Sequence, residues 1–273
     1  MRLDSRREIR YNLGVSQGPV NSTAHHSEGI HTFRLFCAAD RDLTRPYRKA
    51  QVKERVVNSH PIETGPDTQP LQSSIRVLGI AGSPRRRGNT EALLDRFLDG
   101  AQGAGAQVEK LVAARLKIAG CSACESCFET GECAIHDDFQ GVADKLLAAD
   151  VIALAAPLYF WNLPAQVKTV IDRSESQWGR KYVLNTSLPP TPAGHHRRRG
   201  IFISTAGRPH ADFSGTRKTV EEFFYVWEAE PWGELLLADV DAKGAIQDHP
   251  QRLHEAFELG RSAVSEAWSD DEV

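Results

Sequence analysis

The chain has 273 residues, 41% hydrophobic and 25% charged, and its 33 basic and 36 acidic side chains leave a net charge of −3. This composition is typical of a globular protein with one substantial core or two small ones, and it lacks the basic excess of nucleic-acid-binding proteins. The longest apolar run, Val151–Trp161, contains Pro157 and is far shorter than the roughly 18 residues that span a membrane. We therefore expect neither nucleic acid nor a membrane as a partner.

The first 74 residues show no sustained hydrophobic period and end in the breaker-rich segment Pro61–Ser74. We interpret residues 1–74 as a disordered extension that precedes the folded domain. No apolar signal-peptide core follows the charged N-terminus, which favours the cytoplasm over a secretory, disulfide-forming compartment. Cys37, which stands alone in this extension, is expected to be a free thiol.

From residue 75 onward, short apolar segments alternate with amphipathic ones. We expect strands at Ile75–Ala81, Gln107–Leu111, Val151–Ala156, Ile201–Ser204 and Glu234–Val240. We expect helices at Asn89–Gly100, Asp138–Asp150, Pro164–Asp172, Thr216–Glu230 and Gln251–Trp268, with Gly100 ending the first of them. This alternation predicts an α/β fold with a doubly wound, five-stranded parallel sheet over residues 75–270, and with a Cys-rich insertion at 119–136.

The first strand leads into Gly82–Thr90 (GSPRRRGNT), after which the first helix begins. In a doubly wound sheet, ligands bind beyond the carboxyl ends of the strands, where the N–H groups of a helix start attract an anion. Ser83, Arg85, Asn89 and Thr90 add side-chain donors. Because the loop matches neither the P-loop pattern nor the dinucleotide-binding glycine pattern, those two classes are disfavoured. We predict a phosphate site here, and a capped helix start after a tight turn is the alternative.

Two other strand ends carry candidate binding residues. The third strand ends at Pro157 and is followed by Tyr159, Phe160 and Trp161, which can stack on a planar heterocycle or pack as ordinary core residues. After the fourth strand, Ser204–Gly207 offers close approach of a ligand to the backbone.

Four of the five cysteines lie within 13 residues, as Cys121-x-x-Cys124-x-x-Cys127-x5-Cys133. Structural zinc is usually bound by two Cys pairs that a longer loop separates. Thiols at successive three-residue steps instead wrap around one cubane cluster, and all four could serve the same one. Zinc and free thiols remain open alternatives. His136 could complete a zinc site, but we expect it to cap a helix or to be exposed.

In order and spacing, these motifs resemble those of the flavodoxin-like NAD(P)H-dependent FMN reductases and their relatives, the iron–sulfur flavoproteins. The resemblance covers residues 75–268 and rests on Gly82–Thr90, Pro157–Lys168, Ile171–Arg173 and Ser204–Gly207. It implies a flavodoxin-like fold, noncovalent FMN, NAD(P)H as electron donor and a homo-oligomer.

The resemblance also implies roles for individual residues. The phosphate of FMN would be held by Ser83, Arg85, Asn89 and Thr90, with Gly88 in the same loop. The ribityl chain and flavin ring would be lined by Pro157, Leu158, Tyr159, Phe160 and Trp161, with Ser204, Thr205, Ala206 and Gly207 contacting the ring. A [4Fe-4S] cluster would be held by Cys121, Cys124, Cys127 and Cys133.

The expected function is that of an FMN-dependent oxidoreductase that passes electrons from NAD(P)H to a small acceptor such as free flavin or a quinone. The alternative is an iron–sulfur flavoprotein that acts as an electron carrier fed by ferredoxin. No side chain is assigned a catalytic role, because a flavin carries its own chemistry. We expect Lys168, Asp172 and Arg173 at a solvated helix end, with a role in orienting substrate as the alternative. The His195–Arg199 segment is expected in a solvated insertion, and the alternatives are a contact to the 2′-phosphate of NADPH or a partner surface.

Overall fold

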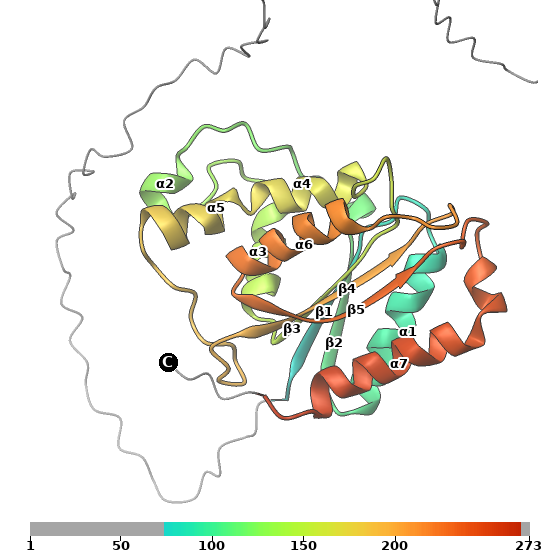
Figure 1. The fold of residues 1–273 in the computed structure, drawn as a ribbon. Coiled ribbons are helices and arrows are strands. Elements are labelled where there is room, and N and C mark those ends of the chain that lie inside the picture. Colours follow the sequence, from blue (N-terminus) through green and yellow to red (C-terminus); the bar gives the residue numbers. More distant parts are fainter. Residues whose placement is uncertain (1–73, 269–273) are drawn as a thin grey trace, which may run out of the picture. The chain divides into compact units, whose positions relative to one another are not determined.

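The computed structural model describes residues 74–268, and the predictions for the N-terminal extension and Cys37 lie outside the described residues. Strands and helices alternate along this range (Figure 1). The strands are β1 (Arg76–Ala81), β2 (Gln107–Val112), β3 (Val151–Ala155), β4 (Arg198–Thr205) and β5 (Ala229–Leu237). The longer helices are α1 (Asn89–Gly103), α3 (Phe139–Leu147), α4 (Ala165–Arg173), α6 (Ser214–Val226) and α7 (Pro250–Ser265). Within the described residues, no helix is both long enough and apolar enough to cross a membrane.

All neighbouring strands pair in parallel, in the order β2-β1-β3-β4-β5. This order confirms the predicted flavodoxin-like, doubly wound sheet. The central strand β3 (VIALA) is buried along its whole length, because helices cover both faces of the sheet. The carboxyl ends of the strands therefore meet at one edge, where the loops after β1, β3, β4 and β5 come together.

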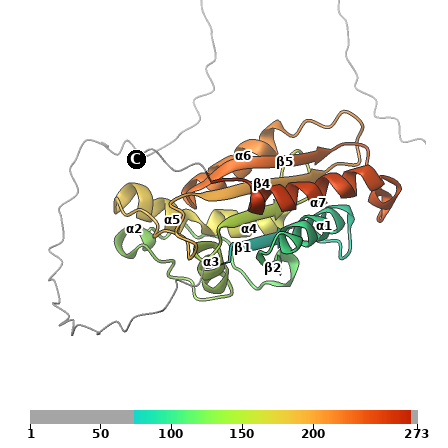
Figure 2. The same cartoon turned by 90° about the horizontal axis from the view of Figure 1, so that it is seen from below.

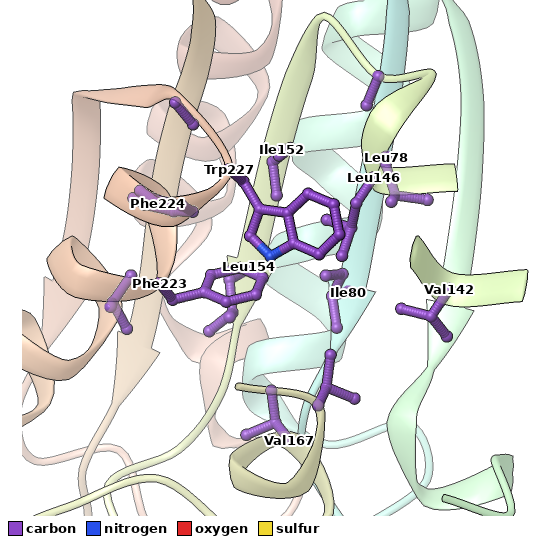
Figure 3. Close-up of a cluster of buried hydrophobic side chains, with 14 of the residues drawn as sticks. Leu78, Ile80, Val142, Leu146, Ile152, Leu154, Val167, Phe223, Phe224 and Trp227 are labelled. Atoms are coloured by element: carbon purple, nitrogen blue, oxygen red, sulfur yellow. The ribbon is translucent and has the colours of Figure 1, made fainter. Parts of the chain in front are cut away.

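Helices lie on both faces of the sheet (Figures 1 and 2). Alternate side chains of the strands contribute to two separate cores, one on each face. One core lies under α3, α4 and α6, and its centre is the fully buried Trp227 (Figure 3). The indole Nε1 of Trp227 donates to Ser174 Oγ at 3.0 Å, so its polar atom is satisfied inside the core. The other core lies under α1 and α7 and includes Phe97, Val151 and Ile203.

Helices α1 and α7 touch through two glycines. A Cβ at Gly100 would lie 1.9 Å from the backbone oxygen of Phe257, and a Cβ at Gly260 would lie 1.9 Å from that of Phe97. The prediction that Gly100 ends the first helix is therefore wrong, since α1 continues to Gly103. Gly100 instead allows the backbones of α1 and α7 to approach closely where the two helices cross.

Two predicted boundaries on the β4–β5 side are also wrong. Helix α6 ends at Val226, and β5 starts at Ala229 rather than Glu234, so the predicted helix end lies within a strand. Pro231 and Gly233 are residue types that weaken a strand interior, but β5 is an edge strand, which tolerates proline and a register shift opposite Gly200.

Five short helical segments in the described part of the chain were not predicted, because each is too short to show a hydrophobic period. Two are the 3-10 segments η1 (Ala113–Arg115) and η3 (Ala245–Asp248). The other three are α2 (Cys127–Thr130), α5 (Glu175–Trp178) and the single π-helical turn η2 (Gly179–Val183). These three pack on one another, with the rings of Phe128 and Trp178 5.5 Å apart. Helix α2, which lies within the Cys-rich segment, is thereby held against α5 and η2.

Candidate functional site

A small cavity of about 70 Å³ lies at the carboxyl ends of the strands. Since pockets for drug-sized ligands measure about 300–1,000 Å³, this cavity can take an end group such as a phosphate, with the rest of a ligand on the open surface. It is lined by Ser83, Arg85, Gly88, Asn89, Thr90, Pro157, Leu158, Tyr159, Thr205, Gly207, Val240, Asp241 and Lys243. Most of the predicted FMN residues are thus brought together.

The loop after β1 presents donors to this cavity. Helix α1 starts after Gly88, whose backbone is extended and which supplies no side-chain cap to the first turn. The N–H groups of that turn are therefore open to an anion. Ser83 Oγ accepts the backbone N–H of Arg85 at 3.1 Å, and Arg85 Nη1 donates to the carbonyl of Asp241 at 3.3 Å. These bonds fold the loop around the helix start.

Asn89 is engaged by the loop after β5. Its Nδ2 donates to the carbonyls of Val240 at 3.4 Å and Ala242 at 2.9 Å. Its Oδ1 accepts the N–H groups of Gly244 at 3.0 Å and Ile246 at 3.3 Å. Because both amide hydrogens and the oxygen already have partners, this side chain holds the loop in place.

That β5 loop brings residues that the sequence reasoning missed, Asp241 and Lys243. A Cβ at Gly207 would lie 2.5 Å from Asp241 Oδ1, so only glycine lets the two loops approach this closely. No ion pair within residues 74–268 involves Lys243. The rule that ligands lie at the strand ends could have drawn attention to this loop, since it follows a predicted strand.

The aromatic residues after β3 form a tight turn. Tyr159 and Asn162 exchange backbone hydrogen bonds of 2.7 and 2.9 Å across it. Phe160 and Trp161, at the tip, both have positive φ, of 48° and 62°. Phe160 is fully exposed, and Trp161 is half-exposed with Arg208 over its ring. Only Tyr159 of the three aromatic residues lines the cavity.

Two predicted residues of the β4 end lie beneath the cavity. Ser204 is fully buried, and its Oγ donates to the carbonyl of Ala156 at 2.7 Å. Ala206 is also buried and does not line the cavity. Thr205 and Gly207, which flank Ala206, are the ones that reach it.

All four clustered cysteines line a second, larger cavity of about 550 Å³ beside α2, α4 and α5. Cys121 and Cys124 are exposed, Cys133 is half-buried and Cys127 is buried. Burial raises the pKa of the Cys127 thiol, and the nearby charges of Cys133, Glu175 and Cys121 add to that effect. The exposed Cys124 thiol has a lowered pKa, because Ser126 and Ser122 donate hydrogen bonds to it.

The donor set suits a thiolate-bound cofactor, since four sulfurs from one short segment share one cavity. Within residues 74–268, no group of three or more His, Cys, Asp or Glu side chains is arranged around a point that could hold a single metal ion. The four cysteines thus have the ligand type of an iron–sulfur cluster and line the same cavity, but their sulfur atoms do not surround one common point in this structure. His136 is exposed, as expected.

Arg173 departs from the prediction of a solvated helix end. Lys168 and Asp172 do form an exposed pair at 2.6 Å, but Arg173 is 1% exposed. Its guanidinium pairs with Asp137 at 2.7 Å. Burial raises the pKa of Asp137, but hydrogen bonds from Arg173, Ala119 and Phe139 outweigh it, and the pKa lies below its ordinary value.

The expected solvated insertion at His195–Arg199 is only partly correct. Arg198 and Arg199 are buried in β4. Arg198 donates to the carbonyl of Leu147 at 2.8 Å. Arg199 donates to the carbonyl of Ala263 at 3.0 Å, near the C-terminal end of α7, where a cation is favoured. These guanidinium groups stabilise the fold and do not face the cavity at the strand ends.

Residues 75–210 match the family model described as NADPH-dependent FMN reductase. The chain is 38% identical over 194 residues to an iron–sulfur flavoprotein of Archaeoglobus fulgidus, an overlap of 71% of this chain and 80% of that one. It is 27% identical over 192 residues to an iron–sulfur flavoprotein of Methanosarcina thermophila, covering 70% of this chain and 91% of that one.

Among solved structures, the fold is similar to that of an NAD(P)H:quinone oxidoreductase from Methanothermobacter marburgensis. The TM-score is 0.53 at 17% identity, and the overlap covers 72% of this chain and 100% of that one.

Proposed function

The chain belongs to the family of NADPH-dependent FMN reductases and iron–sulfur flavoproteins, and we propose that it passes electrons from NAD(P)H through bound FMN to a small acceptor. Free flavin or a quinone is the class of acceptor we propose. The four cysteines would hold a [4Fe-4S] cluster as a second redox centre. When bound, FMN supplies hydride acceptance and the release of electrons singly or in pairs, so the chain has only to bind, orient and shield it.

The observation that carries this proposal is the cavity at the strand ends, which is built for an anion. The open first turn of α1 supplies N–H groups, and Arg85 and Lys243 supply positive charge. Asp241 adds acceptor oxygens that suit hydroxyl groups of a ribityl chain. Pro157, Leu158 and Tyr159 offer a mostly apolar surface next to the cavity, on which a flavin ring would rest.

The first experiment is an ultraviolet–visible spectrum of the anaerobically purified full-length chain, with iron and zinc measured on the same sample. We expect flavin bands on a broad absorbance near 400 nm, and about four irons per chain. Flavin bands without iron would support the FMN reductase and exclude the iron–sulfur cluster. Zinc in place of iron would replace the cluster with a structural metal. A protein that binds no FMN on addition would refute the proposal.

The electron carrier fed by ferredoxin is supported by one further observation, the cysteine cavity, which opens to the surface through Cys121 and Cys124. Stopped-flow reduction distinguishes the two functions. Rapid bleaching of the flavin by NADH or NADPH identifies the reductase, and reduction by ferredoxin alone identifies the carrier. Light scattering on the same sample tests the proposed homo-oligomer.

A further inference from the structure

Arg173 is a buried cation whose contacts converge on the Cys-rich segment. It is the last residue of α4, and its guanidinium lies over the ring of Phe139 at 4.8 Å. Nη1 donates to the carbonyl of Ala119 at 3.0 Å and to Asp137 Oδ2 at 2.7 Å. Nη2 donates to the carbonyl of Ile135 at 2.8 Å. One side chain therefore bonds to both ends of the segment that carries the four cysteines.

Asp137 also links the two ends of the Cys-rich segment. Its Oδ2 also accepts the N–H of Ala119 at 2.8 Å, and its Oδ1 accepts the N–H of Phe139 at 3.0 Å. Gln140 adds a bond from Nε2 to the carbonyl of Ile135 at 2.7 Å. The segment between these bonds contains only one short helix, α2, so its ends are held mainly by side chains from outside it.

One donor of Arg173 is left over. Its Nε is buried and has no hydrogen-bond partner among residues 74–268, although the side chain lines the same cavity as Cys133. Burying a donor without a partner is unfavourable, because the donor gives up its hydrogen bond to water. Such a donor is retained at low cost only when a partner enters the cavity. A thiolate or sulfide is an acceptor of that kind, and several of them together carry negative charge that a buried cation offsets.

We propose that Arg173 is the positioning residue of the Cys-rich segment, which holds its two ends together and donates its free Nε–H to a sulfur of the cysteine-bound cluster. The second half of this inference rests on the proposed cluster, whereas the first half, that Arg173 holds the two ends of the segment together, rests on its hydrogen bonds alone. Hydrogen bonds to cluster sulfurs favour the reduced form, so Arg173 also raises the reduction potential of the cluster.

The test compares three variants of the full-length chain. Arg173→Gln removes the positive charge and most of the guanidinium N–H donors, and Arg173→Lys keeps the charge. Lys168→Met is the matched control, because it removes an exposed cation of the same helix whose one ion-pair partner in the described part of the chain is Asp172.

The first readout is hydrogen exchange of the amides of Ala119 and Phe139 in metal-free protein. In Arg173→Gln we expect exchange about tenfold faster or more, in Arg173→Lys an intermediate rate, and in Lys168→Met the wild-type rate. Wild-type exchange in Arg173→Gln would overturn the inference. Should Arg173→Gln fail to fold, Asp137→Asn, which keeps a polar group beside the guanidinium, must show the faster exchange instead, and its failure to do so would overturn the inference equally.

The second readout is the midpoint potential of the cluster in iron-loaded protein. We expect a lower potential in Arg173→Gln than in Lys168→Met, and equal potentials in the two would refute the Nε–H donor. A wild-type chain that never takes up iron would refute the proposed cluster and with it the donor. Whether Arg173 holds the two ends of the segment together would then be decided by the exchange measurement alone.

Discussion

Replacement of Asn89 by alanine separates two roles that this residue could have. As a direct phosphate ligand, Asn89 would contribute to FMN affinity and little to the stability of the flavin-free protein. In the structure its amide makes four hydrogen bonds to the loop after β5, of which those to Val240 and Ile246 are buried. We therefore expect Asn89→Ala to destabilise the protein even without FMN.

The size of the expected loss in the free energy of unfolding follows from those four hydrogen bonds. The two shorter ones, to Ala242 at 2.9 Å and Gly244 at 3.0 Å, are partly exposed and contribute about 1 kcal/mol each, because water can replace the lost partner. The carbonyl of Val240 and the N–H of Ile246 are buried, and the variant would leave both without a partner. Each unsatisfied group would destabilise the protein by about 1 kcal/mol, toward the low end of the usual range because the two bonds are long. We expect the free energy of unfolding to fall by about 2–4 kcal/mol.

The assay is urea unfolding of the flavin-free, full-length protein, followed by FMN titration of the folded variant. Displacement of the β5 loop should also weaken FMN binding by about tenfold or more, since Lys243 moves with that loop. Ser83→Ala is the comparison variant. Ser83 Oγ accepts a single hydrogen bond, from Arg85 N, so we expect that variant to lose FMN affinity with less than about 1 kcal/mol of stability. Our reasoning is refuted if Asn89→Ala unfolds like wild type while its FMN affinity drops.

Three further predictions concern other parts of the molecule. Gly260→Ala should lower the free energy of unfolding by about 2 kcal/mol or more, measured in urea, because the new Cβ would meet the backbone oxygen of Phe97 at 1.9 Å. Lys243→Met should weaken FMN binding about tenfold and make the affinity less dependent on salt, measured by fluorescence titration at several ionic strengths. Stability should fall in acid as Asp137 protonates. Its lowered pKa means that pairing with Arg173 stabilises the folded state above the ordinary aspartate pKa and that this contribution is lost as pH falls through the lowered value, measured by urea unfolding from pH 6 downwards.

Each of these predictions has a control. Gly141→Ala, in a helix where a Cβ would meet nothing within 4 Å, should be neutral or stabilising, and an equal loss in both glycine variants would contradict the helix-crossing argument. Lys168→Met should leave FMN affinity unchanged, and an unchanged affinity in Lys243→Met would remove that residue from the site. Asp137→Asn should flatten the acid dependence, which an unaltered slope would contradict.

The sequence by itself determined the features that depend on neighbouring residues. The run Val151–Ala155 predicted a strand buried on both faces, and the loop from Gly82 predicted a helix that starts at Asn89. The spacing of the four cysteines placed them within one short segment, so their presence around one cavity followed from the chain itself. Each of these features is encoded within at most 13 consecutive residues.

Only the tertiary structure decided which charged and aromatic side chains are buried and what they contact. Arg173, Arg198 and Arg199 read as solvated, because all but one of the carbonyl and carboxylate groups that accept their hydrogen bonds come from residues 29 to 68 positions away. Lys243 reaches the cavity because β5 lies beside β4, an adjacency that no local pattern contains. Phe160 read as a ring-stacking residue and is exposed, because its direction is set by the turn between Tyr159 and Asn162. Burial of a charge depends on distant partners, and only the fold brings those partners together.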